Sequence, residues 1–487
     1  MKFKNETLIG LILFVGLLFR IHNIGTESLW GDEGLSVYRA KLDMVHTIYD
    51  AASHFHPPLY FSILHFWIEI FGDAESSVRS LSTVFGVLSL LMMFKIGTFL
   101  FNRNVGILSS LLLALSVFHI SYSQEARMYS LMALLTLFSF HFFIKLLKEE
   151  STKIPVGFIL STSLLMYSHN YGLFIVMAQN IYFFLVSSAS NKTDMRRWLL
   201  LQGILFCLYL PWIYILILQV ALVQKNFWIS TPTVFSIIDS LKEYSGSTYS
   251  LVLLLVSVLL SFMTLKRGDS NIDGKDSLTA VTDSSLTKEK LNNIVLLSVW
   301  LLTPIVVPFI VSLFSQPIYF TRYTISASLA FYLLAAKGID AMHSRAFKAL
   351  IIFLIIIASL VNIYGYFNTT HKEQWRDVAG YLAQNTRSDD LILLLGGKQV
   401  FDYYFKNVDV KTKQFPFKFL KKVNEEKMNG EKIEEVNSTV RNFNRVWILV
   451  KGKNDDDGLI RKTLSERHNL LYHKKYIGIE VDLFAKK

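Results

Sequence analysis

Long apolar stretches recur along the chain, separated by short polar segments. Residues 294–314 contain no charged residue, and residues 347–367 contain only Lys348, near the start of the stretch. About 20 helical residues cross the roughly 30 Å of hydrocarbon in a bilayer, so each stretch is long enough to span a membrane. The pattern predicts about eleven membrane-spanning helices, at residues 7–24, 77–100, 105–122, 128–147, 154–168, 171–188, 198–220, 249–265, 293–314, 323–336 and 347–367.

One further apolar stretch, residues 57–71, is not counted as a span. As a helix it would be roughly 22 Å long, which is short for a crossing. It begins with two prolines, which suit a helix start, and it carries His65 and Glu69. We therefore expect it to lie along the membrane surface.

The distribution of basic residues predicts the topology. Cytoplasmic loops are enriched in Lys and Arg, and eleven spans with a cytoplasmic N-terminus place most loop cations on that side. Counting residues 57–71 as a span would invert every later loop and break this match. In the eleven-span topology, the cytoplasmic loops hold Arg103, Lys145, Lys148, Lys153, Lys192, Arg196, Arg197, Lys266, Arg267, Lys337, Arg345 and Lys348.

The fold class that follows is a polytopic α-helical membrane protein of the plasma or inner membrane, followed by a small α/β domain. Residues 1–367 form the membrane domain. Within it, residues 25–76 are a large first extracytoplasmic loop with helices on the membrane surface, and the polar residues 266–292 are a flexible cytoplasmic loop. Residues 368–487 are polar, and the odd span count places them outside. Their pattern predicts a helix over 373–384 and strands over 390–395, 445–451 and 476–484.

Composition and charge exclude some classes of partner and site. The chain is 52% hydrophobic with a net charge of +11, but much of the basic charge lies in short loops and reflects topology, so nucleic acid is not an expected partner. The single cysteine, Cys207, cannot form a disulfide within the chain. No Gly-rich phosphate loop ending in Lys-Ser or Lys-Thr is present. The chain therefore shows no sequence sign of a nucleotide-binding loop.

The first cluster with candidate chemistry is the acidic pair Asp32 and Glu33, which follows the first span. Behind it Leu35, Tyr38 and Leu42 recur at helical spacing, so the pair opens an amphipathic helix on the membrane surface. An acid at a helix N-terminus is stabilised by the helix dipole. The pair is either a helix cap or a general base at the membrane surface.

The second cluster is His54 and His56, in the same outer loop and followed by two prolines. Two histidines at this spacing are candidate metal ligands, or they are structural. No third or fourth ligand is evident, so a divalent metal is left open as a cofactor and is not asserted.

Two further clusters lie in separate outer loops. One contains Glu125, Arg127 and Tyr129, and the other contains Arg322 and Tyr323. Arginines on the outer side run against the positive-inside trend, and a guanidinium matches phosphate oxygens in a bidentate fork. The structural alternatives are a Glu125–Arg127 pair within its loop and an interfacial arginine that reaches lipid headgroups. The pair His169-Asn170, in another outer turn, is a lesser candidate that we interpret as structural.

These clusters share one membrane face, and together they suit displacement at a lipid-linked phosphate. A carboxylate would take a proton from an acceptor hydroxyl while arginines stabilise the charge on the departing phosphate. A transporter or flippase of a lipid-linked sugar is the main alternative, although ionisable groups lie near the span ends and not at mid-membrane. A polysaccharide polymerase or ligase is a second alternative.

Five short motifs, in order, carry a resemblance to a known family. They are Leu-Trp-Gly-Asp-Glu at 29–33, His-Pro-Pro-Leu-Tyr at 56–60, Arg-Ser-Leu-Ser-Thr-Val-Phe-Gly at 79–86, Gln-Glu-Ala-Arg-Met-Tyr at 124–129, and Arg-Tyr at 322–323. Over residues 1–367 the chain resembles the GT-C type glycosyltransferases of the protein-O-mannosyltransferase and aminoarabinose-transferase group (glycosyltransferase family 39-like).

The resemblance implies an inverting transfer of a sugar from a polyprenyl-phosphate donor, on the extracytoplasmic face. Asp32 would be the catalytic base, and Glu33 would orient it or help place the acceptor. Arg322 and Arg127 would hold the donor phosphate and His56 would contact the donor, while Glu125, Tyr129 and Tyr323 would line the substrate pocket. The large luminal module of eukaryotic protein mannosyltransferases is absent. The resemblance therefore does not identify the acceptor, which is left open between protein, lipid and glycan.

Overall fold

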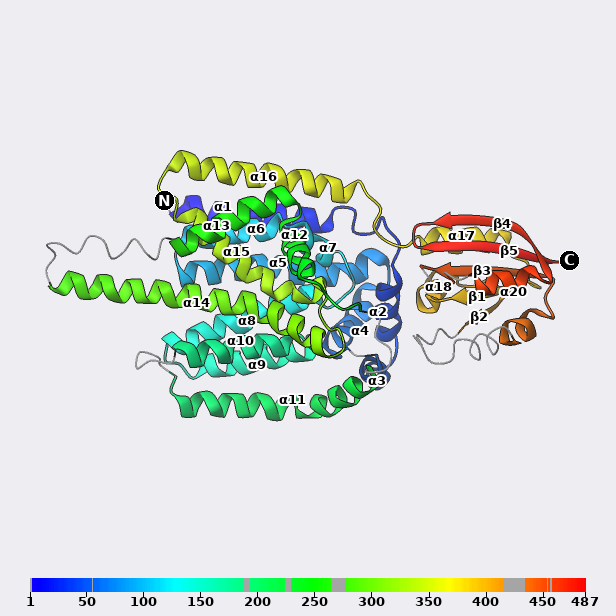
Figure 1. Cartoon of the computed structure of the whole chain (residues 1–487), viewed down its shortest axis with the longest axis horizontal. Helices are drawn as coiled ribbons and strands as arrows, with labels where there is room; N and C mark the ends of the chain where they lie inside the picture. Colours follow the sequence, from blue (N-terminus) through cyan, green and yellow to red (C-terminus); the bar gives the residue numbers. More distant parts are fainter. Residues whose placement is uncertain are drawn as a thin grey trace.

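The computed structural model describes residues 2–54, 56–186, 193–223, 229–263, 277–415, 434–452, 454–455 and 458–487. Most helices run roughly parallel in one elongated bundle, and a small sheet domain follows at one end of it (Figure 1). The N-terminus lies at the opposite end of the bundle (Figure 1).

The bundle consists of helices of very different length. Its first half comprises α1 (Lys2–Ile21), α2 (Gly31–Ala40), α3 (Met44–Ser53), α4 (Leu59–Phe71), α5 (Glu75–Leu100), α6 (Arg103–Ala114), α7 (Val117–Ser123) and α8 (Tyr129–Lys148). The second half comprises α9 (Lys153–Ser168), α10 (Gly172–Val186), α11 (Met195–Val223), α12 (Val234–Ser245), α13 (Thr248–Met263), α14 (Ser277–Phe314), the 3-10 helix η2 (Thr321–Thr324), α15 (Ile325–Asp340) and α16 (Arg345–Phe367).

The number of membrane spans differs from the prediction. Every predicted span falls on a helix, but in the described part of the chain only five helices are long and apolar enough to cross a membrane. The count rises to seven if each of two bent helix pairs is one span. Helices such as α9, α10 and α15 have only 16, 15 and 16 residues, so the predicted count of eleven is not confirmed.

The bent pairs explain part of this difference. The predicted span 105–122 is broken between α6 and α7, which meet at 63°. Ser116 starts α7 by accepting a hydrogen bond from the His119 backbone N–H. Helix α13 is joined to α12 at 94°, after Gly246 ends α12 with φ of +81°. The periodicity of apolar residues predicts such helices but does not predict the turn between them.

The first outer loop contains short helices, as expected, but its layout differs in detail. The amphipathic helix predicted from the acidic pair onward is two helices, α2 and α3, because Asp43 interrupts it and caps α3 by accepting from the backbone N–H groups of Val45 and His46. Within residues 57–71, the short helix α4 begins at Leu59, and its 13 residues are too few to cross a membrane. All three lie at the end of the bundle nearest the sheet domain (Figure 1).

The predicted flexible loop over 266–292 needs a correction. Helix α14 already begins at Ser277 and runs without interruption to Phe314, so residues 277–292 are helical. Residues 266–276 lie outside the described residues. The Ser, Thr, Asp and Lys content of this stretch suggested a loop, but a polar segment that extends from a long apolar helix can continue its hydrogen bonding into solvent.

The C-terminal α/β domain contains a five-stranded mixed sheet. Its helices are α17 (Trp375–Asn385), α18 (Lys398–Tyr404) and α20 (Leu459–Ser465). Its strands, in the spatial order β2-β1-β3-β5-β4, are β1 (Leu391–Leu395), β2 (Lys411–Gln414), β3 (Arg445–Lys451), β4 (His468–Tyr476) and β5 (Ile479–Lys486). Strands β2, β1 and β3 are parallel, and β3-β5 and β5-β4 are antiparallel.

The central strand β1 shows why this domain folds as a layered sheet. All five of its residues are buried, and they alternate between two apolar clusters. Leu391, Leu393 and Leu395 join one cluster with residues of α20, whereas Ile392 and Leu394 join the other with residues of α17 and α18. The predicted helix 373–384 and strands 390–395 and 445–451 correspond to α17, β1 and β3, while the predicted strand 476–484 starts three residues before β5.

Candidate functional site

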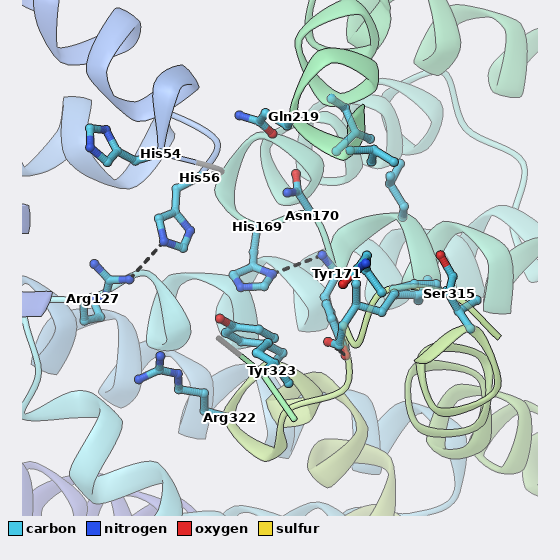
Figure 2. Close-up of a pocket in the computed structure, with 18 of the residues that line it drawn as sticks. His54, His56, Arg127, His169, Asn170, Tyr171, Gln219, Ser315, Arg322 and Tyr323 are labelled. Atoms are coloured by element: carbon cyan, nitrogen blue, oxygen red, sulfur yellow. Dashed lines mark hydrogen bonds between the residues drawn. The ribbon is translucent and has the colours of Figure 1, made fainter. Parts of the chain in front are cut away.

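A cavity of about 420 Å³ lies between the first outer loop and the helices α10, α11 and α14. Polar side chains gather at one part of its wall, where Asp32, His56, Arg127, His169 and Arg322 all face it. Figure 2 shows Arg127, Arg322, His56 and His169 pointing toward a common space. Much of the remaining wall is apolar and consists of Leu173, Phe174, Leu216, Val220, Val311 and Ile318, among others.

Asp32 lies between two guanidinium groups. Its Oδ2 atom is 3.4 Å from Arg322 Nη1 and 3.8 Å from Arg127 Nη2. Its side chain is 32% exposed, whereas that of Arg127 is 2% exposed and that of Arg322 is 14% exposed. The carboxylate is therefore open to the cavity, while both cations are largely shielded from water, where their charge acts more strongly.

Local structure fixes both arginines. Arg127 Nη1 donates to the Asp32 carbonyl oxygen and to Ser36 Oγ, each at 3.2 Å, so Arg127 is tied to the first turns of α2. Arg322 is part of η2, and its guanidinium lies 5.7 Å from the ring centre of Tyr129 and 5.6 Å from that of Tyr323. These aromatic faces attract the cation and limit where it can move.

Three histidines line the cavity, and the environment of two of them, His56 and His169, favours the neutral form. Burial, together with the charges of Arg127 and Arg322, lowers the pKa of His169 to about 3. Burial and the charge of Arg127 also hold the pKa of His56 well below its usual value. His169 Nδ1 accepts a hydrogen bond from the Tyr171 backbone N–H at 3.1 Å, so its single proton sits on Nε2 (Figure 2). His56 Nε2 lies 3.4 Å from Arg127 Nη2.

Glu33 occupies a different environment from its neighbour Asp32. It is fully buried and does not line the cavity. Arg79 donates to both of its oxygens, at 2.8 and 2.7 Å, and Lys372 Nζ lies 3.1 Å from Oε2. Burial alone would raise the pKa of Glu33, but Arg79 and Lys372 outweigh it and lower the pKa to about 2. Glu33 is thus held as a carboxylate between Arg79 and Lys372, away from the space where a substrate would lie.

Glu125 and Tyr129 also lie behind the wall of the cavity. The residues that line the cavity include Tyr323 but neither of these two. Burial raises the pKa of Glu125 to about 7, and its Oε2 has no hydrogen-bond partner in the described part of the chain. Tyr129 is fully buried, and its ring lies 6.3 Å from that of Tyr323. Tyr129 therefore supports the wall through Tyr323 and Arg322.

The histidine pair does not come with further metal ligands. His54 and His56 both line the cavity, but the side chain of His54 is 51% exposed and lies 3.4 Å from Asp50. Among the described residues, no group of three or more His, Cys, Asp and Glu side chains is arranged to hold a metal ion.

Three residues near the site were missed or undervalued by the sequence analysis. His169 was interpreted as structural, yet it lines the cavity. Arg39 is fully buried, and its Nε lies 2.5 Å from Asp50 Oδ2. It follows Asp32 by seven positions, two helical turns on the same side of α2, so helical spacing could have found it. Lys372 reaches Glu33 from the start of the sheet domain, and no sequence pattern signals that contact.

Comparison with known proteins identifies the fold of the chain. Residues 55–215 match the family of dolichyl-phosphate-mannose-protein mannosyltransferases. ArnT from Cupriavidus metallidurans superimposes with a TM-score of 0.63 at 10% identity, over 98% of this chain and 97% of that one. The chain has the GT-C glycosyltransferase fold. The resemblance predicted from the sequence is thus confirmed: the chain has the GT-C fold, and residues 55–215, about a third of it, match the mannosyltransferase family. Its apolar helices and this fold indicate a membrane location.

Two other solved structures extend this result. The oligosaccharyltransferase AglB from Archaeoglobus fulgidus has a TM-score of 0.60 at 11% identity, covering 100% of this chain and 74% of that one. The arabinofuranosyltransferase AftD from Mycobacteria has a TM-score of 0.53 at 12% identity, covering 98% of this chain and 41% of that one. A search of curated proteins gave no match. Since ArnT is covered almost completely, the likeness to it includes the sheet domain as well as the helical bundle.

Proposed function

We propose that this protein transfers a sugar from a polyprenyl-phosphate-linked donor to a protein, lipid or glycan acceptor, with inversion at the anomeric carbon. The observation that carries the proposal is one cavity whose wall has an apolar part and a positively charged part. Its apolar wall suits a hydrocarbon chain, and Arg127 and Arg322 at its polar part suit a phosphate. Asp32, the exposed carboxylate, lies beside both cations.

The proposed chemistry assigns a role to each of these groups. The acceptor hydroxyl attacks the anomeric carbon from the face opposite the phosphate, which inverts the configuration. Its proton passes to Asp32, and the electron pair of the breaking carbon–oxygen bond remains on the departing phosphate. Arg127 and Arg322 stabilise that growing charge, and the Nε2 proton of His169 is available as a further donor. His56 contacts the donor beside Arg127.

Ligands of the structural relatives support a lipid carrier as the donor. One ArnT structure from Cupriavidus metallidurans contains undecaprenyl phosphate, and it has the same TM-score of 0.63 to this chain. The AglB structure contains a dolichol-phosphate together with an inhibitory peptide. Both molecules are phosphates on long hydrocarbon chains, which is the chemistry that the cavity wall offers here.

The proposal also specifies the side of the membrane on which the site lies. Helix α2, which carries Asp32, lies near the end of the bundle that carries the sheet domain and far from the N-terminus (Figure 1). With a cytoplasmic N-terminus, the proposed location of the site and of residues 368–487 is the extracytoplasmic face of the cell membrane. The basic residues of the loops at the other end support that orientation.

The test is transfer by purified wild type and Asp32→Asn, with a panel of polyprenyl-phosphate sugars as donors. Loss of a general base lowers the rate by about 10²- to 10⁴-fold. The matched control is Asp402→Asn, because Asp402 pairs with Lys398 on the surface of the sheet domain. Equal turnover by wild type and Asp32→Asn would remove Asp32 as the base and direct attention to Glu125. Wild type that binds donors but never consumes one would favour a carrier of lipid-linked sugars.

A further inference from the structure

The sheet domain contacts the beginning of α2, the helix that carries Asp32. At the start of α2, the side chain of Trp30 caps no helix N–H, and the Trp30 backbone N–H donates to Glu33 Oε2 at 3.3 Å. Leu29 N–H donates to Tyr404 Oη at 2.6 Å, and Gly31 N–H donates to Glu373 Oε2 at 3.0 Å. Free N–H groups at a helix start need acceptors, and here residues more than 340 positions later supply them.

A second contact fixes the same turn from its buried side. Lys372 is 9% exposed, and its Nζ lies 3.1 Å from Glu33 Oε2 and 2.9 Å from the Gln124 carbonyl oxygen. Glu33 in turn accepts from the Ala126 backbone N–H at 2.9 Å. One lysine therefore joins the acidic pair to the loop that carries Arg127.

The fit between α2 and the sheet domain is also close. A Cβ on Gly34 would come 2.4 Å from the Cβ of Val400 in α18. A Cβ on Gly31 would come 1.9 Å from Lys451 Nζ, which itself pairs with Glu373 Oε1 at 3.0 Å. Helix α2 can hardly shift relative to the sheet domain without breaking these contacts.

We infer that the sheet domain is a positioning element for the active site, and that Lys372 and Glu373 hold the Asp32 turn in its working geometry. This inference rests on the proposed function for its catalytic consequence, but the geometric part stands without it. Neither residue touches the cavity, so both act through α2 and Glu33. A displacement of about 1 Å in a catalytic group can lower a rate by about 10²-fold, and contacts of this kind prevent it.

Hydrogen exchange tests the geometric part without any donor. Lys372→Met and Glu373→Ala should raise the exchange rates of amides in residues 29–36 by about tenfold or more, while those of β1 and β3 keep their wild-type rates. Lys475→Met is the control, because Lys475 is 71% exposed and pairs with Glu480 on β5 of the same domain. Wild-type exchange over residues 29–36 in both variants would overturn the inference. If Lys372→Met unfolds the sheet domain, Glu373→Ala decides alone.

Kinetics test the catalytic part with the same proteins. We expect kcat to fall by about 10- to 100-fold in Lys372→Met, with undecaprenyl phosphate binding within about twofold of wild type and partial recovery in Lys372→Arg. A proportional loss of binding and kcat would show a general structural defect and overturn the positioning role. If the wild type transfers no sugar, the proposed function fails, and the exchange result still decides whether the sheet domain holds α2.

Discussion

The adjacent acids Asp32 and Glu33 should respond in opposite ways to loss of charge. Glu33→Gln leaves Arg79 and Lys372 buried with no carboxylate between them. Removing one partner of a buried ion pair costs about 3–5 kcal/mol. The pKa of Glu33 gives a similar figure, since a fall from 4.5 to about 2 corresponds to about 3 kcal/mol. Asp32→Asn, at a carboxylate that is 32% exposed and no closer than 3.4 Å to either arginine, should lower stability much less than Glu33→Gln does.

The assay is unfolding of the purified variants in detergent, together with sugar transfer. Because the folded-state pKa of Glu33 is depressed, its contribution is fully present above about pH 4.5 and is lost as the pH falls toward 2. The stability gap between wild type and Glu33→Gln should therefore be constant from pH 6 to 8 and shrink in acid. We expect Asp32→Asn to unfold like the wild type and to have lost activity. A stable Glu33→Gln, or an Asp32→Asn that unfolds early, would refute this division of roles.

Three further predictions follow from single contacts. Arg322→Ala should weaken undecaprenyl phosphate binding by about 10- to 100-fold in a titration, and Arg322→Lys should recover only part of it because Lys lacks the bidentate fork. Glu125→Gln should stabilise the protein above pH 7 and not at pH 4.5, since a carboxyl whose folded-state pKa is raised to about 7 lowers stability progressively as the pH rises from about 4.5 to 7; equal melting temperatures at pH 8 would contradict this. Gly34→Ala should cost about 1–3 kcal/mol in unfolding measurements because of its clash with Val400, whereas Gly203→Ala, with nothing within 4 Å, should not destabilise.

Hydropathy and motif order predicted much of the fold and a good part of the site. The sequence located the helices of the bundle and the strands β1 and β3, because apolar periodicity reports buried faces directly. It also brought Asp32, Arg127, Arg322 and His56 to one site, and these four do line one cavity. Outer-loop arginines were informative because a cation there is unusual in a membrane protein.

What the sequence could not predict depends on contacts between distant segments. Asp32 and Glu33 are chemically alike and adjacent in the sequence. Glu33 is buried because it pairs with Arg79 and Lys372, whereas Asp32 stays partly exposed. The 63° bend between α6 and α7 does not appear in hydropathy either, since the two helices together are apolar enough for one span. The predicted number of spans is not confirmed for the same reason, because a run of apolar residues does not show where a helix turns or stops short.

Helix α11 has a consequence for how a substrate arrives. Only 22% of its most apolar stretch is buried, and Leu216 and Val220 on it form part of the cavity wall, opposite Val311 of α14. A long-chain donor would reach that wall sideways, by diffusing in the plane of the bilayer, without passing through water. Its supply would then depend on the mole fraction of the lipid in the membrane, so rates measured in detergent should vary with the ratio of donor to detergent and not with the bulk donor concentration alone.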